Sequence, residues 1–468
     1  MSRFKPRNSA LADESGRANV HLRVPETELV LPGSALSRFK PGSLAAGPTE
    51  KLAFGLNMLF LFFVNSRIIE LFPLNASLHL MVVLSIASGV VAIFNGMLWR
   101  TLASGLGTLY LCLTIWFGLT IPVSVWPGGA AGVFRSEWLT SLCTFFLVAS
   151  IPINSQQVLK AMWVSACAFL AAGLLALTRG AVVDGRLFMA SGGTFGNPNY
   201  LAAAMCTGVL LWWFILRIPR QRWFWRTVGI GAVAILIMVT VQTGSRGALC
   251  ALLATAPFLV MQYSLASRLW IAIGFVTVLL LGFMAAPGLT VKRLTVFFEP
   301  DQSVASQAEY QFERSATQSA QSRLSLLKRS LEITGQYPIL GAGIGMFAIA
   351  EDKLARAEGV PSMWHGTHNT YTQVSSETGI PGLILFLAIL AANWRALSAL
   401  RRDRRLKLHV DGPEIQTAAT ALWLILLDTM IYAVFAHFAY SYTIPIISGL
   451  VVALSRCASR ELEQVSGR

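Results

Sequence analysis

Apolar stretches of about 20 residues alternate with short polar or basic breaks over most of the chain. A transmembrane α-helix needs about 20 consecutive, mostly apolar residues, so the pattern predicts twelve such spans. Their expected bounds are 52–71, 76–95, 103–122, 138–152, 158–178, 199–217, 226–242, 247–263, 268–287, 379–397, 417–436 and 441–456. The expected fold is therefore an all-α polytopic membrane bundle, in which every backbone group is satisfied within its own helix.

The bulk composition agrees with this pattern. Of the 468 residues, 54% are hydrophobic and 13% are charged, whereas soluble domains carry about 25% charged residues. An ordinary soluble domain is therefore excluded, and the lipid bilayer is the expected partner of most of the surface.

The positive charge is concentrated in loops that belong to one membrane face. The formal net charge is +14, and cytoplasmic loops carry an excess of Lys and Arg. The basic residues of the two richest loops are Arg217, Arg220, Arg222 and Arg226, and then Arg395, Arg401, Arg402, Arg404, Arg405 and Lys407. Both loops and both termini are predicted to be cytoplasmic, in a bacterial inner membrane, and no nucleic-acid partner is expected.

This topology divides the chain into five segments. The first is basic and rich in Pro, Gly and Ser, which predicts a disordered tail whose binding to anionic lipid or a partner stays open. The segments are a cytoplasmic tail 1–50, N-terminal transmembrane helices 51–287, an extracytoplasmic loop 288–375, C-terminal transmembrane helices 376–457 and a second cytoplasmic tail 458–468.

The long extracytoplasmic loop has a polar first part and a helical second part. Residues 301–321 are rich in Gln, Ser and Glu, which predicts a solvated or mobile segment. Leucines recur at helical spacing over 323–333, so a short helix is expected there. Gly341, Gly343 and Gly345 follow in a spacing that matches no nucleotide-binding motif, and they are expected to let the loop pack closely on helix ends.

Cysteine and acidic residues give no indication of a metal ion. The cysteines fall within predicted spans or at the cytoplasmic end, and no Cys/His spacing matches a zinc site. The acidic residues of the exported loops form no tight pair that would hold a divalent ion. Neither a metal nor another cofactor is expected.

A specific pattern ends the long loop, in THNTYTQVSSETGIPGLILFL. His368 and Asn369 are followed by nine residues, Gly379, two residues and Gly382. This segment resembles the signature H-[NSQ]-x9-G-x-x-G of the O-antigen ligase and polymerase superfamily. The members of that family are membrane glycosyltransferases that use polyprenyl-diphosphate-linked glycans.

Three further stretches agree with the family in order and location. TFGNPNYLA at 194–202 resembles its F-x-N-P-N segment, and TGSRGA at 243–248 resembles its Arg-containing turn. RLSLLKRSLEITGQYPILGAGIGMF resembles the segment before the catalytic histidine, so the resemblance covers about residues 190–400. It implies a GT-C-like glycosyltransferase fold in which the outer loop caps a cavity.

The resemblance also implies roles for three residues. His368 looks like the family's essential histidine, and Arg246 and Arg323 look like the two arginines implicated in recognising the donor diphosphate. Imidazole can take a proton from a hydroxyl near neutral pH, and guanidinium groups stabilise a departing diphosphate. From the residues alone, Arg246 could instead snorkel to the headgroups and Arg323 could lie on a solvated helix face.

Six further residues are weaker candidates, each with a structural alternative. They are Arg186, Asn197, Asn199, His365, Asn369 and Glu377. Asn197 and Asn199 flank a proline at the start of a span, where asparagine caps helices. Arg186 and His365 fall in solvated loops, and Glu377 would favour a helix N-terminal dipole.

The expected function is that of an O-antigen ligase, which transfers a glycan from undecaprenyl diphosphate to a hydroxyl of lipid A–core on the periplasmic face. A polymerase that adds O-antigen or exopolysaccharide repeat units to a growing glycan stays open, as do other polysaccharide-assembly membrane proteins as partners. A transporter or lipid flippase is the alternative of another class. It predicts paired halves or charged residues in mid-membrane, which the sequence does not favour.

Overall fold

A computed structural model describes residues 47–71, 80–189, 193–218, 221–295 and 307–466. The predicted tail 1–50 lies outside the described residues except for its end, where the first helix already begins. In chain order the elements are α1 (Pro48–Ser66), η2 (Ile68–Leu71), α3 (Leu80–Phe94), α4 (Trp99–Leu102), α5 (Gly105–Thr120), α6 (Pro127–Val133), η3 (Phe134–Trp138), α7 (Leu139–Ser150), α8 (Ser155–Arg179), β1 (Gly180–Val183), β2 (Arg186–Met189), η4 (Thr194–Gly196), α9 (Pro198–Arg217), α10 (Trp223–Gln242), α11 (Arg246–Val260), α12 (Leu265–Ala285), α13 (Gly288–Thr295), α14 (Gln307–Gln336), α15 (Phe347–Ala357), α16 (Thr370–Arg402), η5 (Arg405–Leu408), α17 (Gly412–Tyr432) and α18 (Thr443–Ser466).

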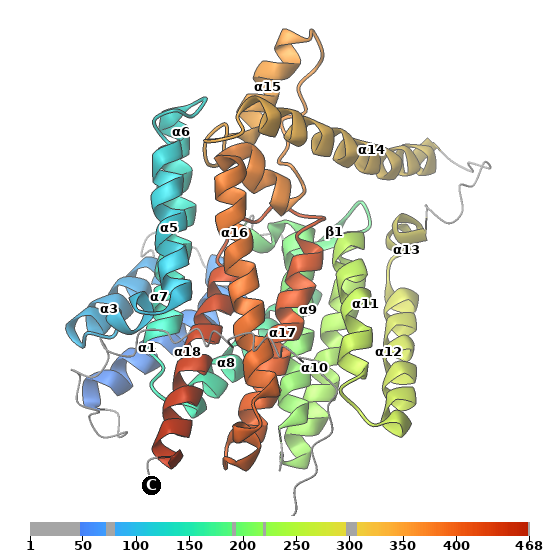
Figure 1. The fold of residues 1–468 in the computed structure, drawn as a ribbon. Coiled ribbons are helices and arrows are strands. Elements are labelled where there is room, and N and C mark those ends of the chain that lie inside the picture. Colours follow the sequence, from blue (N-terminus) through green and yellow to red (C-terminus); the bar gives the residue numbers. More distant parts are fainter. Residues whose placement is uncertain (1–46, 72–79, 190–192, 219–220, 296–306, 467–468) are drawn as a thin grey trace, which may run out of the picture. The chain divides into compact units, whose positions relative to one another are not determined.

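Each predicted span overlaps a helix of the described chain (Figure 1). Six helices of the described chain are long and apolar enough to cross a membrane, namely α8, α9, α10, α12, α16 and α17. The apolar helices α3, α5 and α11 are shorter. The architecture is that of a multi-pass helical membrane protein, and the count of twelve spans stays a prediction.

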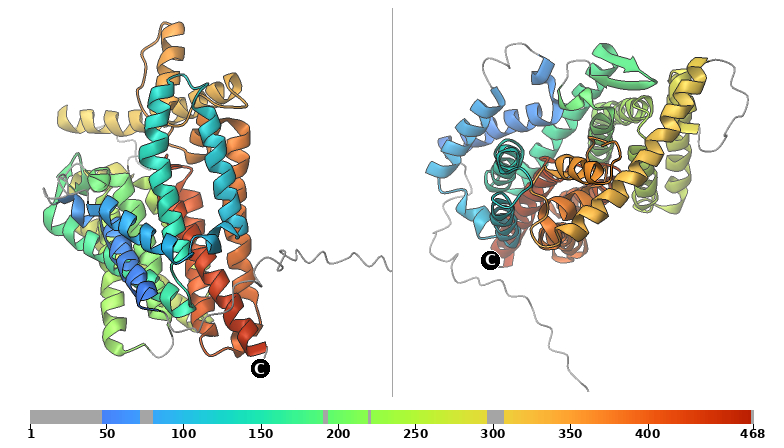
Figure 2. Two further views of the ribbon diagram at one scale, coloured as in Figure 1. Left: turned by 90° about the vertical axis from the view of Figure 1, so that its left-hand side faces the viewer. Right: turned by 90° about the horizontal axis from the view of Figure 1, so that it is seen from above.

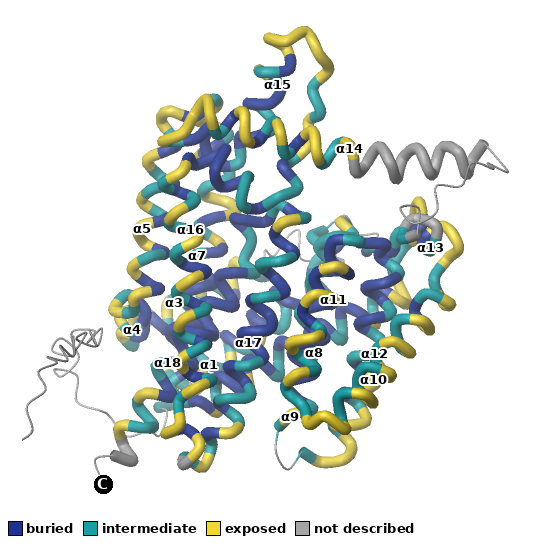
Figure 3. The backbone as a smooth tube through the Cα atoms, turned by 45° about the vertical axis from the view of Figure 1, so that its right-hand side comes forward, coloured by how far each residue is buried: buried dark blue, intermediate teal, exposed yellow. Residues whose placement is uncertain are grey.

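Helix α12 shows why the bundle needs a lipid environment. Its only buried residue is Gly282, while apolar side chains such as Leu269 and Trp270 are 65% and 74% exposed. An apolar helix that exposes nearly its whole circumference is stable in lipid and not in water. In Figure 3, exposed residues recur along α10 and α12.

The interior of the bundle is built around α9, which packs against α8, α10 and α17. The ring of Trp212 on α9 is fully buried, and its Nε1–H donates to the backbone oxygen of Ala166 at 2.9 Å. This bond satisfies the polar atom of an otherwise apolar side chain. The core thus places the N-terminus of α9 firmly at one end of the bundle.

Helices α14 and α15 lie beyond the end of the bundle at which α16 begins (Figures 1 and 2). The sequence predicted a short helix over 323–333, whereas α14 already begins at Gln307. Leu326 and Ile333 of α14 pack with Phe347 of α15 in a small apolar cluster separate from the main core. The described part of the outer loop is therefore a folded cap.

Helix α16 is broken at Gly379, whose φ of 74° and ψ of 178° are not helical. Pro381 has no N–H to donate to Glu377, and the N–H of Ile380 donates to the oxygen of Pro338 at 2.8 Å instead of to Ser376. The freed carbonyls of Ser376 and Glu377 accept hydrogen bonds from the glycine-rich connection between α14 and α15, both at 2.8 Å. A Cβ atom at Gly379 would lie 1.9 Å from the oxygen of Ile339. Only glycine fits this break.

Two other glycines permit equally close packing. A Cβ atom on Gly341, which has a φ of +68°, would lie 2.3 Å from the carbonyl carbon of Glu377. One on Gly382 would lie 2.1 Å from Oγ1 of Thr378. The close approach of Gly341 to Glu377 therefore confirms, for this glycine, the prediction that the connection packs closely on a helix end.

A β-hairpin adds to the predicted all-α fold. Strands β1 and β2 pair antiparallel with Val183 opposite Arg186. Asp184 and Gly185 form the turn with φ of 49° and 66°, the pattern of a two-residue type I′ hairpin. The hairpin brings Arg186 to the start of α9, where its Nη2 donates to Oδ1 of Asn199.

Candidate active site

His368 lies in the turn that leads into α16, half-buried, with a φ of +51°. The left-handed region costs an L-residue roughly 1–2 kcal/mol. Asn369 caps the helix, since its Oδ1 accepts from the backbone N–H groups of Tyr371 at 2.9 Å and Thr372 at 3.1 Å. The cap holds His368 in its strained conformation, and such strain is typical of functional sites.

The ring of His368 packs against two other imidazoles. Its centroid lies 5.0 Å from that of His437, with 78° between the ring planes, and 6.4 Å from that of His365. Burial, then the proximity of His437, Arg323, His365 and Arg186, lowers the pKa of His368 to about 4. The imidazole is therefore neutral at pH 7, the form that can accept a proton.

Arg186 belongs to this cluster through the hairpin. Its Nη2 donates to Oδ1 of Asn199 at 2.8 Å, and its Nε donates to the oxygen of Thr243 at 3.1 Å. The backbone oxygen of Asn199 accepts from the hydroxyl of Tyr432 at 2.8 Å. Asn197 instead caps α9 by accepting from the N–H of Asn199. Of these two asparagines, Asn199 is the one that connects the hairpin to α9 and α17.

The two arginines suggested by the resemblance approach the same end of the bundle. Arg323 on α14 is half-buried, and burial lowers its pKa. Arg246 begins α11 beside Ser245, whose hydroxyl donates to Oδ1 of Asn199 at 3.0 Å. A Cβ on Gly247 would lie 2.6 Å from Cβ of Phe435, so the start of α11 packs on the segment between α17 and α18.

The contacts of Glu377 and His365 differ from those of the His368 cluster. The carboxyl group of Glu377 is buried and accepts from the N–H groups of Gly345 and Phe347 and from the hydroxyl of Tyr440. His365 is exposed, and its Nδ1 contacts the backbone oxygen of Met363. Glu377 thus joins α16 to two other segments, and a role of Glu377 or His365 in the reaction stays a prediction.

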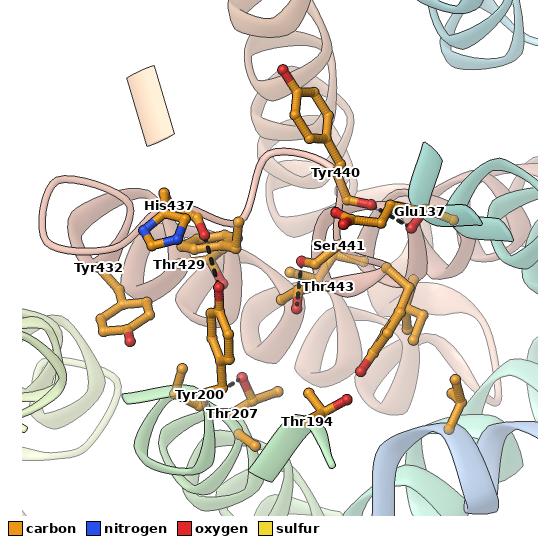
Figure 4. Close-up of a pocket in the computed structure, with 18 of the residues that line it drawn as sticks. Glu137, Thr194, Tyr200, Thr207, Thr429, Tyr432, His437, Tyr440, Ser441 and Thr443 are labelled. Carbon is orange, nitrogen blue, oxygen red and sulfur yellow. Dashed lines mark hydrogen bonds between the residues drawn. The ribbon is translucent and has the colours of Figure 1, made fainter. Parts of the chain in front are cut away.

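A cavity of about 700 Å³ lies beside the imidazole cluster. Figure 4 shows tyrosine, threonine and serine hydroxyl groups around it, with His437 at one side. Gly366, Glu137, Asp428 and Arg67 also line it. Among the described residues, the lining includes His437 but not His368, so His437 connects the cavity to the cluster.

Sequence reasoning missed His437. Its signal is an imidazole in the short break between the last two predicted spans, which the topology places on the same side as His368. Arg186 was only a weak candidate, because nothing local shows that a hairpin carries it to α9. Placing His437 and Arg186 in the site requires knowledge of contacts between segments that lie far apart in the sequence.

A possible metal-binding group lies elsewhere. His409, Asp411 and Glu461 bring three ligand atoms within 4.8 Å of one another, the one such group in the described chain. It lies beyond the end of α16 opposite to His368. Glu461 accepts hydrogen bonds from the N–H and hydroxyl of Ser155 at 2.8 and 2.9 Å, which satisfies a free donor at the start of α8.

The fold and the site define a multi-pass helical membrane protein with histidine and arginine side chains gathered at one end of its bundle. Residues 231–387 match the family model described as O-antigen ligase. The match confirms the predicted resemblance to the O-antigen ligase and polymerase superfamily. The matched stretch contains Arg246, Arg323 and His368 and ends before His437. No curated protein matches the chain.

Proposed function

We propose that this protein transfers a glycan from undecaprenyl diphosphate to an acceptor hydroxyl of lipid A–core on the periplasmic face, with His368 as the catalytic residue. The main support for the proposal is the position of His368 in the structure. It is held in a strained turn, it packs on His437, and it lies near Arg323 and Arg186. The family match covers His368 and supports this type of reaction.

In the proposed reaction, the acceptor oxygen attacks the anomeric carbon of the donor sugar. The new bond forms as the bond from that carbon to the diphosphate oxygen breaks, and the leaving diphosphate keeps the electron pair. Neutral His368 takes the proton of the acceptor hydroxyl, so atoms and charges balance. Direct displacement inverts the anomeric centre.

The arginines stabilise the leaving diphosphate in this proposal. Guanidinium groups stay charged and bind phosphate oxygens through paired N–H groups. Arg323 and Arg246 take the roles that the resemblance implies, and Arg186 adds a third positive charge on the same side. These side chains supply the positive charge that the departing group requires, so the proposal needs no metal ion.

The first test uses a strain from which the gene for this protein has been deleted. The strain is complemented with wild-type protein, His368→Ala or His409→Ala at matched expression, and the glycan products are compared. His409 is the control because it follows α16 in the chain, beyond the end of that helix opposite to His368. We expect His368→Ala to lower transfer by about 10²-fold or more, the usual contribution of a general base, and to accumulate lipid-linked glycan. His409→Ala should match wild type.

The product identifies the acceptor. Glycan on lipid A–core supports the ligase, whereas longer lipid-linked or secreted chains would make the protein a repeat-unit polymerase with the same site. If His368→Ala transfers glycan as fast as wild type, His368 is not the catalytic residue.

A further inference from the structure

His437 lies outside both the matched family segment and the residues that the resemblance covers. It belongs to the segment between α17 and α18, yet its ring meets that of His368 edge to face at 5.0 Å. It also lines the cavity, which His368 does not. His437 is thus the imidazole between the space for a substrate and the proposed base.

The backbone around His437 is fixed to the start of α16. Thr370 donates its hydroxyl to the oxygen of Ala436 at 2.7 Å, and this hydroxyl accepts from the N–H of Phe438 at 3.3 Å. The hydroxyl of Tyr200 donates to the oxygen of His437 itself at 3.0 Å, the bond drawn in Figure 4. The hydrogen bonds reach His437 and the residues on either side of it, so His437 is held relative to His368.

The ring of His437 fits under the turn that carries His368 only because residue 366 is glycine. A Cβ atom there would lie 2.5 Å from Nε2 of His437. Gly366 lines the cavity together with His437. The two histidines and Gly366 therefore form one tightly packed unit at the cavity wall.

A role in packing alone does not explain an imidazole at this place. Its Nδ1 is shut away from solvent and has no partner among the described residues. A buried polar atom without a partner costs roughly 1–3 kcal/mol. A phenylalanine ring would have a similar shape without this cost, so the nitrogen atoms of His437 need another reason.

We propose that His437 is a positioning residue of the transfer reaction, which holds the His368 ring from the cavity side and aligns it with an acceptor hydroxyl bound in the cavity. This inference rests on the proposed function. It adds a residue that acts through His368, and it assigns the cavity to the acceptor.

The charges around His368 give this role a signature in the pH dependence. The groups that face His368 are His437 from the α17–α18 segment, Arg323 from α14, Arg186 from β2 and His365 from its own segment. After burial, His437 is the largest cause of the lowered pKa of His368. When the imidazole of His437 is removed, the pKa of His368 rises. The acid side of the profile of rate against pH then moves to higher pH.

The experiment measures transfer between pH 4 and 8 in membranes from the deletion strain, with the lipid-linked glycan of that strain as donor. The variants are His437→Gln, His437→Phe and Gly366→Ala, with His409→Gln as the control. We expect all three site variants to lower the rate at pH 7 by roughly tenfold to a hundredfold, as misplaced catalytic groups do. His437→Gln should also shift its acid half-maximum upward, while His409→Gln keeps the wild-type profile.

A packing role predicts otherwise, because His437→Phe would then keep the wild-type rate. Wild-type rates and pH profiles in His437→Gln and His437→Phe would overturn the inference. If His437→Phe fails to fold, the rate and the pH profile of His437→Gln still decide, because glutamine keeps a polar side chain at this position. His368→Ala in the same membranes separates the outcomes: activity without His368 ends the proposed function, whereas its loss together with full activity of His437→Gln ends only this inference.

Discussion

The carboxyl group of Glu377 joins segments that lie far apart in the sequence. It accepts from the N–H of Gly345 at 3.0 Å, from the N–H of Phe347 at 3.3 Å and from the hydroxyl of Tyr440 at 2.6 Å. These bonds connect α16 to the start of α15 and to the segment before α18. At the residue scale, Glu377 therefore holds the start of α15 and the segment that contains His437 against α16.

We expect Glu377→Ala to destabilise the folded protein by about 3 kcal/mol, because three buried donors lose their acceptor. Thermal unfolding in detergent measures the change. Glu358→Ala is the control, since its ion pair with Arg329 lies on the surface, where such pairs contribute little. Equal midpoints for both variants would contradict the structural role of Glu377.

At the element scale, the decisive feature is the break in α16. The sequence places Gly379 and Gly382 at the start of a span, but the helix already begins at Thr370. The break turns the first part of α16, with its cap at Asn369, toward the glycine-rich connection. The glycines of the signature thus permit the backbone geometry and the close packing at the start of α16.

Gly379→Ala should therefore be far more harmful than Gly359→Ala. Both glycines have positive φ, of 74° and 70°, but a Cβ atom meets the oxygen of Ile339 at 1.9 Å in the first case and nothing within 4 Å in the second. We expect about 1 kcal/mol of left-handed strain for Gly359→Ala and several times more for Gly379→Ala. Folded yield after size-exclusion chromatography and the thermal midpoint test this order.

For the whole molecule, the hydrophobic pattern was sufficient to predict where the apolar helices of the bundle lie, because a membrane span needs apolar residues over a fixed length. It did not predict the extent of the polar helix α14. The same pattern carries no information on which helix ends meet. The Asp184–Gly185 turn between apolar residues is a hairpin signal that the sequence does contain. The approach of His437 and Arg186 to His368 follows only from the packing of distant segments, so the sequence could not place these two side chains beside the predicted catalytic histidine.

The orientation of the molecule in the membrane is a last prediction at this scale. His368 precedes α16, and the basic residues that follow its transmembrane part are Arg401, Arg402, Arg404, Arg405 and Lys407. Since basic loops stay in the cytoplasm and α16 is long enough to cross the bilayer, His368 should face the opposite side. We expect alkaline phosphatase fused after Gly359 to be active and a fluorescent protein fused after Arg468 to be bright. The reverse pattern would place the imidazole cluster in the cytoplasm, where a periplasmic acceptor could not reach it, and would rule out the proposed reaction at this site.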